Sequence, residues 1–362
     1  MVSLVHDAAE ASEVSRLAAW VASAHGAPVA RRVRLAAAGF ALPTSQPLTH
    51  VLLHSPEVRR SVVRLVETRP FDVVVPYGTA MARYVFEAPL QRVPCVLDMI
   101  DVDSEKWAML GQTAAPWMRP VYRREARLLR RFERRAFDRA CSTAVVNERE
   151  LELLDRVAGR PGGVAIPNGV DLQSFAPPQE PAENCQVVFC GVFNYGPNEQ
   201  GAHWLATEVW PKVLASKPNA TLLLVGAEPS RAVRDLAQRP SIRVTGSVAD
   251  VRPFLWGSAV AAAPLQLARG VQNKVLEALS AGLPCVVTPP VLEGLPEAVR
   301  PGCRPASDAE SFARHLVTLL NETPASRRHL ASMANLSRLG WSEQLHPFLD
   351  LVDSCGRPAG KP

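Results

Sequence analysis

The segment CQVVFCGVFNYGPNEQGAHWLATEVWPKVLASKPNATLLLV (residues 185–225) decides the fold. It contains two short apolar runs, QVVFC (186–190) and TLLLV (221–225), on either side of a stretch with helical spacing near residues 198–216. Continuous apolar runs of this length are typical of strands that are buried on both faces of a parallel sheet. The segment therefore predicts a strand, a crossover helix and a second, parallel strand.

The same alternation continues toward the C-terminus. The further predicted strands are IRVT (242–245), AVAAA (259–263) and CVVT (285–288), and the predicted helices lie near 229–238, 250–257, 273–281 and 308–321. Strands that alternate with helices at this spacing indicate an α/β fold with a parallel sheet covered by helices.

The N-terminal half repeats this pattern less regularly. Its predicted strands are VSLV (2–5), FDVVVP (71–76), PCVLD (94–98) and STAVV (142–146), and a Pro-rich stretch at 166–184 is the predicted linker. The length of 362 residues favours two domains, which we expect at 1–175 and 183–340, facing each other across a cleft. The first glycine is Gly26, so we expect the N-terminal domain to lack its first strand and glycine-bearing loop.

Composition limits the classes of protein. The seven cysteines are scattered and form no C-x-x-C pair, which indicates neither a disulfide framework nor a zinc cluster and favours a reducing cytosol. No apolar run approaches the roughly 20 residues that span a bilayer, and no signal peptide is evident. The formal net charge is +5, but residues 119–139 alone hold nine arginines against three acidic residues, so the basic character is local.

One short motif carries the chemistry. In RGVQNKVLEALSAGLP (269–284), Lys274 and Glu277 lie three residues apart and point to the same side of a predicted helix that begins near Asn273, a good N-cap residue. The helix N-terminus, Arg269 and Lys274 would attract a diphosphate, and Glu277 could accept hydrogen bonds from ribose hydroxyls. The alternative is that Lys274 and Glu277 form an ordinary surface pair.

These residues resemble the donor-binding signature of family 4 glycosyltransferases of the GT-B architecture, which has two Rossmann-like domains. In EALSAGLPCVVT (277–288), Glu277 matches the second Glu of that signature, and GWSEQLHPFLDLV (340–352) resembles the helix that returns to the first domain, here 341–355. Longer stretches, such as DMIDVDSEKW (98–107), resemble sugar transferases associated with exosortase and exopolysaccharide gene clusters. The resemblance implies a donor domain at 183–340, an acceptor-side domain at 1–175, and donor contacts at Gly191, Val248, Pro264, Gly270, Asn273, Glu277 and Thr288.

Two departures from the family pattern concern charge. Arg269 stands where the first Glu of the signature is expected. The two usual phosphate-binding cations are absent, because Val192 and Phe193 follow Gly191 and Gln200 precedes Gly201. Our hypothesis is that Arg269 and Lys274 replace them as the catalytic cations, and the alternative is that the site has decayed.

The stretch DVD (101–103) offers a second candidate site. It mimics the D-x-D motif with which a different glycosyltransferase fold binds a metal ion, but the GT-B architecture generally needs no metal, so we expect none. Asp101 and Asp103, with Tyr77 and Thr79 after the predicted strand 71–76, are instead candidates for acceptor contacts.

The arginine-rich helix at 119–139 is amphipathic, with Leu128, Leu129, Phe132 and Ala136 at helical spacing. Two interpretations remain open, a solvated helix with internal Glu–Arg pairs and a surface that docks on anionic lipid. Binding to nucleic acid is not indicated, because no aromatic platform accompanies the charge.

Together these features predict a glycosyltransferase that moves a sugar from a nucleotide-diphosphate donor to a glycan or polyprenyl-linked acceptor in polysaccharide synthesis. The resemblance implies retention of anomeric configuration and no cofactor beyond the donor itself. We expect a cytoplasmic protein that binds peripherally to the inner face of the membrane. A nucleotide-sugar epimerase of the same fold and a non-catalytic binding module remain alternatives.

Overall fold

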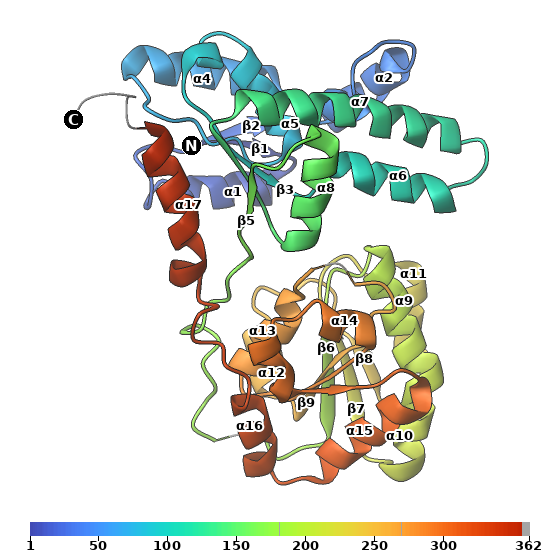
Figure 1. Cartoon of the computed structure of the whole chain (residues 1–362). Helices are drawn as coiled ribbons and strands as arrows, with labels where there is room; N and C mark the ends of the chain where they lie inside the picture. Colours follow the sequence, from blue (N-terminus) through green and yellow to red (C-terminus); the bar gives the residue numbers. More distant parts are fainter. Residues whose placement is uncertain (181, 269, 357–362) are drawn as a thin grey trace. The chain divides into compact units, whose positions relative to one another are not determined.

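The computed structural model describes residues 1–180, 182–268 and 270–356 (Figure 1). Its contacts divide the chain into two compact units, Met1–Ile166 together with the chain from His346, and Pro167–Leu345. The N–H of Val170 donates to the carbonyl oxygen of Leu339 (2.8 Å), and Arg252 and Trp256 donate to the carbonyl oxygens of Ser174 and Phe175. These bonds tie residues 170–175, which the sequence analysis assigns to the first domain, to the second unit.

The first unit is built on parallel strands. Strand β1 (Val2–Val5) pairs with β2 (His25–Pro28) across helix α1 (Ala8–Leu17), and β4 (Ser142–Val145) lies between β3 (Val96–Ile100) and β5 (Gly163–Ala165). The other helices are α2 (Arg31–Ala41), α3 (Leu48–Leu52), α4 (Pro56–Thr68), α5 (Thr79–Ala82), α6 (Asp103–Thr113), α7 (Arg119–Arg139), α8 (Glu148–Ala158) and the end of α17 (Trp341–Gly356).

The predicted strand at 71–76 is wrong in form. The structure has two isolated parallel bridges there, Val74 with Cys95 and Tyr77 with Asp98. Pro76 has no N–H to donate, which interrupts the ladder. The segment nevertheless runs beside β3, because the N–H of Gly78 donates to the carbonyl oxygen of Asp98 (2.7 Å).

The second unit is a six-stranded parallel sheet in the order β11-β10-β9-β6-β7-β8. Its strands are β6 (Gln186–Cys190), β7 (Thr221–Val225), β8 (Ile242–Val244), β9 (Val260–Ala263), β10 (Cys285–Val287) and β11 (Cys303–Pro305). Its helices are α9 (Gly196–Trp204), α10 (Trp210–Ser216), α11 (Arg231–Asp235), α12 (Arg252–Trp256), α13 (Asn273–Ser280), α14 (Pro289–Glu293), α15 (Ala309–Asn321) and α16 (Pro324–Ser332). A π-helical turn, Leu205–Val209, joins α9 to α10.

This sheet confirms the predicted α/β fold and creates a switch point. The chain builds β6, β7 and β8 outward on one side and then returns to place β9 on the other side of β6. The loops after β6 and β9 therefore diverge, and in open α/β sheets the crevice between such loops binds ligands. Strands β6 and β9 are almost entirely buried, as expected for a sheet covered on both faces.

Candidate functional site

The predicted donor residues gather at the carboxyl ends of the second unit's strands. Gly191 follows β6, Pro264 follows β9, Thr288 follows β10, and α13 begins nine residues after Pro264 with Asn273. The loop after β6 and helix α13 thus flank the switch point between β6 and β9. Sequence and topology place the candidate site at the same edge of the sheet.

Helix α13 is short and firmly ended. Gly282 adopts a left-handed φ of 80°, its N–H donates to the carbonyl oxygen of Leu279, and the N–H of Leu283 donates to that of Ala278. This is a Schellman ending, which satisfies the last carbonyl groups of the helix. Buried Val275, Leu276 and Leu279 anchor α13 to the core, so the remaining face is held in a fixed direction.

Lys274 is the central cation of this site. Its ammonium Nζ donates a hydrogen bond to Oδ1 of Asn198 (2.6 Å) and lies 4.9 Å from the centre of the Phe189 ring. Burial lowers the pKa of Lys274 to about 8, although the neighbouring Cys190 and Glu277 act in the opposite direction. A half-buried ammonium with a neutral partner is well placed to gain an anion.

Asn198 is a functional candidate that the sequence analysis missed. It is buried in α9, its Nδ2 donates to the carbonyl oxygen of Val192 (2.9 Å), and its Oδ1 accepts from Lys274. A Cβ on Gly191 would come within 3.0 Å of Nδ2, so a glycine is needed for this close approach. Asn198 therefore joins the loop after β6 to α13, and only a contact between residues 76 positions apart reveals it.

Glu277 does not neutralise Lys274 through a direct ion pair. Within the described residues, the side chains of Lys274 and Glu277 make no contact as close as a salt bridge, and burial raises the pKa of the Glu277 carboxyl. Both side chains are half-buried. The interpretation of Lys274 and Glu277 as an ordinary exposed surface pair therefore does not describe this helix.

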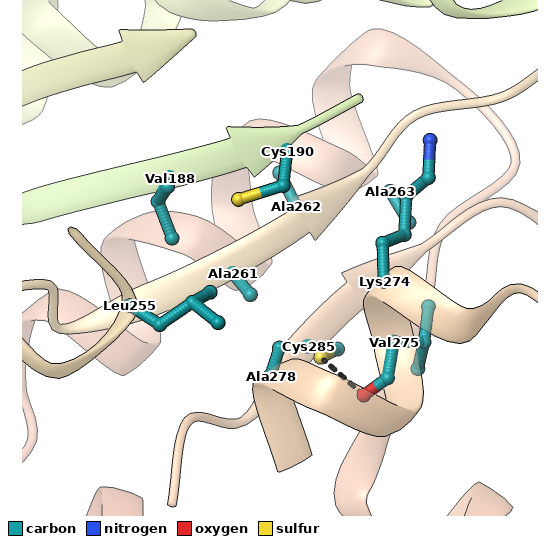
Figure 2. A pocket seen from close by; sticks show the side chains of 10 residues that line it. All are labelled: Val188, Cys190, Leu255, Ala261, Ala262, Ala263, Lys274, Val275, Ala278 and Cys285. Atoms are coloured by element: carbon teal, nitrogen blue, oxygen red, sulfur yellow. Dashed lines mark hydrogen bonds between the residues drawn. The ribbon is translucent and has the colours of Figure 1, made fainter. Parts of the chain in front are cut away.

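A small cavity lies below the cation (Figure 2). It has a volume of about 10 Å³ and is lined by residues of β6, β9, α12, α13 and β10, among them Cys190, Ala262 and Cys285. Figure 2 shows the aliphatic part of Lys274 beside these residues, with its nitrogen pointing away from them. A space of this size holds one water molecule at most, so the cavity cannot accommodate a nucleotide.

Of the predicted donor residues, Asn273 differs from the prediction and Arg269 lies outside the described residues. Asn273 is the first residue of α13 and not its N-cap, which is Gln272. In the described structure the Oδ1 of Asn273 is buried and has no hydrogen-bond partner.

The other predicted donor residues have structural roles as well. The Thr288 hydroxyl donates to the carbonyl oxygen of Leu265, and Val248 packs against the core. Gly270 has a left-handed φ of 59°, and its carbonyl oxygen would lie 2.4 Å from a Cβ on Gly294. Pro264 is buried, and its carbonyl oxygen comes close to Gly201 of α9.

The positions of the two absent family cations are also clear. Val192 is half-exposed, Phe193 is fully buried in the core, and Gln200 is exposed. Phe193 is therefore fixed by packing. Among the cations named for this site, Lys274 is the one that the described structure places at the switch point.

The candidate acceptor residues come together in the first unit. Tyr77 lies beside Asp98 and Asp101. Partial burial is the larger cause that raises the pKa of its hydroxyl, and the charges of the two Asp side chains raise it further. Thr79 is buried, and its hydroxyl has no hydrogen-bond partner within the described residues. Burial raises the pKa of the Asp103 carboxyl. All four predicted residues thus lie at the carboxyl ends of the 74–77 segment and β3.

The backbone at this place is strained. Ile100, between Asp98 and Asp101, has a φ of 68°, which is unusual for a β-branched residue, and the β3 register shifts there. Buried carboxylates hold the next residues: Oε2 of Glu150 accepts from the N–H of Val102 and Oε1 of Glu133 from that of Ser104, both at 2.9 Å. Strain that the surroundings impose is common where side chains must be aimed at a ligand.

The described residues contain neither a metal-binding cluster nor a membrane-spanning helix. No group of three or more His, Cys, Asp and Glu side chains is placed to share a metal ion there. None of the helices in that part of the chain combines the length and apolar character needed to cross a membrane.

Part of the chain matches a known protein family. Residues 184–322 match the sequence model of the family described as Glycosyl transferases group 1. A search of curated proteins finds no match.

Solved structures resemble most of the chain. Sucrose-phosphate synthase from Thermosynechococcus elongatus is 18% identical over 85% of this chain and 78% of its own, with a TM-score of 0.63. Anabaena HepE in complex with UDP is 14% identical over 98% and 92%, with a TM-score of 0.64. Trehalose 6-phosphate synthase from Burkholderia multivorans is 13% identical over 82% and 75%, with a TM-score of 0.58. The chain shares the GT-B fold with these proteins.

Proposed function

We propose that this chain is a glycosyltransferase and that it binds the diphosphate of a nucleotide-sugar donor between the loop after β6 and the N-terminus of α13. The match of residues 184–322 to the group 1 family and the GT-B fold support this proposal. The observation that carries the proposal is Lys274, a half-buried ammonium held at the switch point by the neutral Asn198. A diphosphate would supply the negative charge that this position lacks. HepE has been solved with UDP and glucose, which favours UDP as the donor nucleotide.

In the proposed reaction, the bond between the anomeric carbon and the diphosphate oxygen breaks and its electron pair stays with the diphosphate. An acceptor hydroxyl oxygen forms the new bond to that carbon, with retention of configuration, and its proton passes to the departing diphosphate oxygen. Lys274, Arg269 and the N-terminus of α13 would stabilise the growing charge on the leaving group. Glu277 would hold the ribose hydroxyls, and neither a metal ion nor a cofactor takes part.

The acceptor proposal rests on the first unit. Tyr77, Asp101 and Asp103 offer hydroxyl and carboxylate oxygens at one strand edge, which suits the hydroxyl groups of a glycan. We extend the proposal to a glycan or polyprenyl-linked acceptor in exopolysaccharide synthesis, at the inner face of the cytoplasmic membrane.

The test of donor binding is calorimetric titration with UDP and with uridine. Lys274→Ala should weaken UDP binding roughly ten- to a hundredfold, the size of a charge-assisted hydrogen bond, and leave uridine binding unchanged. Lys212→Ala is the matched control, because Lys212 is an exposed lysine of the same unit that pairs with Glu310. Equal losses for UDP and uridine would contradict the proposal.

The pH dependence gives a second readout. Since the pKa of Lys274 is about 8, its ammonium loses its proton as the pH rises through that value. UDP affinity should therefore fall above about pH 8 in the parent, while Lys274→Arg, which stays charged, should keep its affinity.

Turnover separates the enzyme from its alternatives. Consumption of a UDP-sugar that requires an added acceptor supports the transferase. Isomerisation of the donor without acceptor would indicate an epimerase, and UDP binding without any turnover would indicate a binding module.

A further inference from the structure

Helix α2 has an apolar outer face that packing within the first unit does not explain. The exposed fractions are 61% for Val33, 57% for Leu35 and 83% for Phe40, and Leu42 beyond the helix end is also exposed. Val33 and Phe40 are seven residues apart and therefore lie on one stripe of the helix, whereas Leu35 and Leu42 lie on another side of it. Figure 1 shows α2 on the outside of the first unit, alongside α7.

The face next to this stripe anchors the helix. Ala37, Ala38 and Ala41 pack against Leu48 and Val51 of α3 and Val121 of α7. The guanidinium group of Arg124 on α7 donates to the carbonyl oxygens of Ala41 (2.9 Å), Thr44 and Gln46 (3.0 Å). The orientation of α2 relative to α7 is thus fixed, and its apolar side is presented outward.

Exposed arginines lie on α2 itself and on the side of α7 from which Arg124 reaches α2. Arg31 and Arg32 begin α2 and are exposed. On α7, Arg127 and Arg131 follow Arg124 by three and seven residues, so they continue along the same side of that helix. In the described part of the chain neither makes an ion pair, unlike Arg130, which pairs with Glu105.

An exposed apolar stripe bordered by arginines has the chemistry of a helix that lies in a membrane surface. Apolar side chains would enter the boundary between headgroups and acyl chains, and the guanidinium groups would meet lipid phosphates. A second copy of the chain fits less well, because a two-fold contact through this face would bring the arginines of both copies together.

We propose that α2 docks on an anionic bilayer, with Val33 and Phe40 inserted and with Arg31, Arg32, Arg127 and Arg131 on the lipid phosphates. The inference deepens the membrane location proposed above and rests on it. Its test does not use the transfer reaction, so the two can fail separately.

The test is flotation of the full chain with phosphatidylcholine vesicles that contain or lack phosphatidylglycerol. The double variant Val33→Glu/Phe40→Glu should lose at least about tenfold in affinity for anionic vesicles, as expected when buried apolar side chains are replaced by charges. Trp20→Glu is the matched control. Trp20 is also exposed, but it lies before the start of β2, whereas α2 begins after the end of β2. Trp20 is therefore at the opposite end of that strand from α2.

The charge is tested separately. Arg127→Gln/Arg131→Gln should weaken binding about fivefold for each arginine, and raised salt should weaken the parent in the same way. Arg69→Gln/Arg92→Gln removes two exposed arginines that precede the 74–77 segment and β3, and it should have little effect.

Unchanged thermal melting and UDP affinity in each variant establish that it folds. Vesicle binding by Val33→Glu/Phe40→Glu that equals the parent's would overturn the proposal, as would a parent that does not bind. A parent that self-associates in sedimentation without binding vesicles, through a contact that this variant abolishes, would assign the face to a second copy instead.

Discussion

Helices α7 and α13 both carry charge on an apolar framework, but they use it differently. In α7, Glu125 and Glu133 point inward and accept hydrogen bonds from backbone N–H groups of other helices. In α13, Lys274 and Glu277 are half-buried, and within the described residues they form no ion pair with each other. The fold itself satisfies both carboxylate oxygens of Glu125, whereas Glu133 has Oε1 bound and Oε2 buried without a partner in the described residues. Lys274 and Glu277 lie at the proposed donor site.

A charge that stabilises the fold can be recognised by the backbone groups that it binds. The backbone groups that Glu125 and Glu133 bind belong to the first turns of α3 and α6, where N–H groups have no partner inside the helix. Internal Glu–Arg pairing, one interpretation of the α7 sequence, is therefore not what these two glutamates mainly do. Complete hydrogen bonding of a buried carboxylate, as at Glu125, indicates an architectural role. Glu133, with one unpartnered oxygen in the described residues, shows that an incomplete partner set does not by itself mark a site.

The largest effect should come from Glu125. Its two carboxylate oxygens accept from the N–H groups of Leu48 (2.7 Å) and Thr49 (2.8 Å). Glu125→Ala leaves both donors buried without a partner, so the free energy of unfolding should fall by about 3 kcal/mol. Glu125→Gln, which keeps one acceptor oxygen, should lose less. Urea unfolding, monitored by circular dichroism, measures the free energy of unfolding of both variants. If Glu125→Ala is as stable as the parent, Glu125 does not stabilise the fold.

Glu133 gives a pH-dependent version of the same test. Burial raises the pKa of Glu133 from its ordinary 4.5 to about 7. Between these values the folded state holds a proton that the unfolded state has lost, so stability should fall as the pH rises from about 4.5 to 7, by on the order of 3 kcal/mol. Glu133→Gln cannot titrate and should flatten this part of the profile. An equally steep decline in that variant would assign the dependence to other groups.

On the α13 side, Asn198→Ala should weaken UDP binding about tenfold, because it removes the acceptor that orients the Lys274 ammonium. In a Lys274→Ala background the same change should have almost no further effect, since the two residues act together. Gln200→Ala, at an exposed position two residues away, is the control. Additive losses in the double variant would show that Asn198 acts independently of Lys274.

The smallest effect is expected at the surface of α7. Arg130 pairs with Glu105 on α6, and the Arg130 side chain is half-exposed. Solvent-exposed pairs contribute little, so Glu105→Ala should change the free energy of unfolding by about 0.5 kcal/mol. A loss as large as that of Glu125→Ala would mean that exposure does not separate the two classes of glutamate on this unit.

Sequence patterns were most informative about the second unit. The predicted strands at 186–190 and 221–225 match β6 and β7, and the predicted helices near 273–281 and 308–321 lie within a residue or two of α13 and α15. The first unit was harder, because its short strands are separated by several helices and Pro76 breaks the predicted strand at 71–76. The sequence analysis also took Asn273 as the N-cap, since its preferred residue type outweighed the one-position shift to Gln272.

The sequence by itself determined the alternation of strands and helices and the C-terminal end of α13, because periodicity and glycine conformation are local properties of the chain. It also marked Lys274 and Glu277 as unusual charges in an apolar helix. Only the tertiary structure decided that Lys274 bonds to Asn198 and that Glu125 binds the start of α3, because these partners are 76 or more residues apart along the chain. Which charges are satisfied by the fold depends on such distant contacts, and the order of residues in one segment does not encode them.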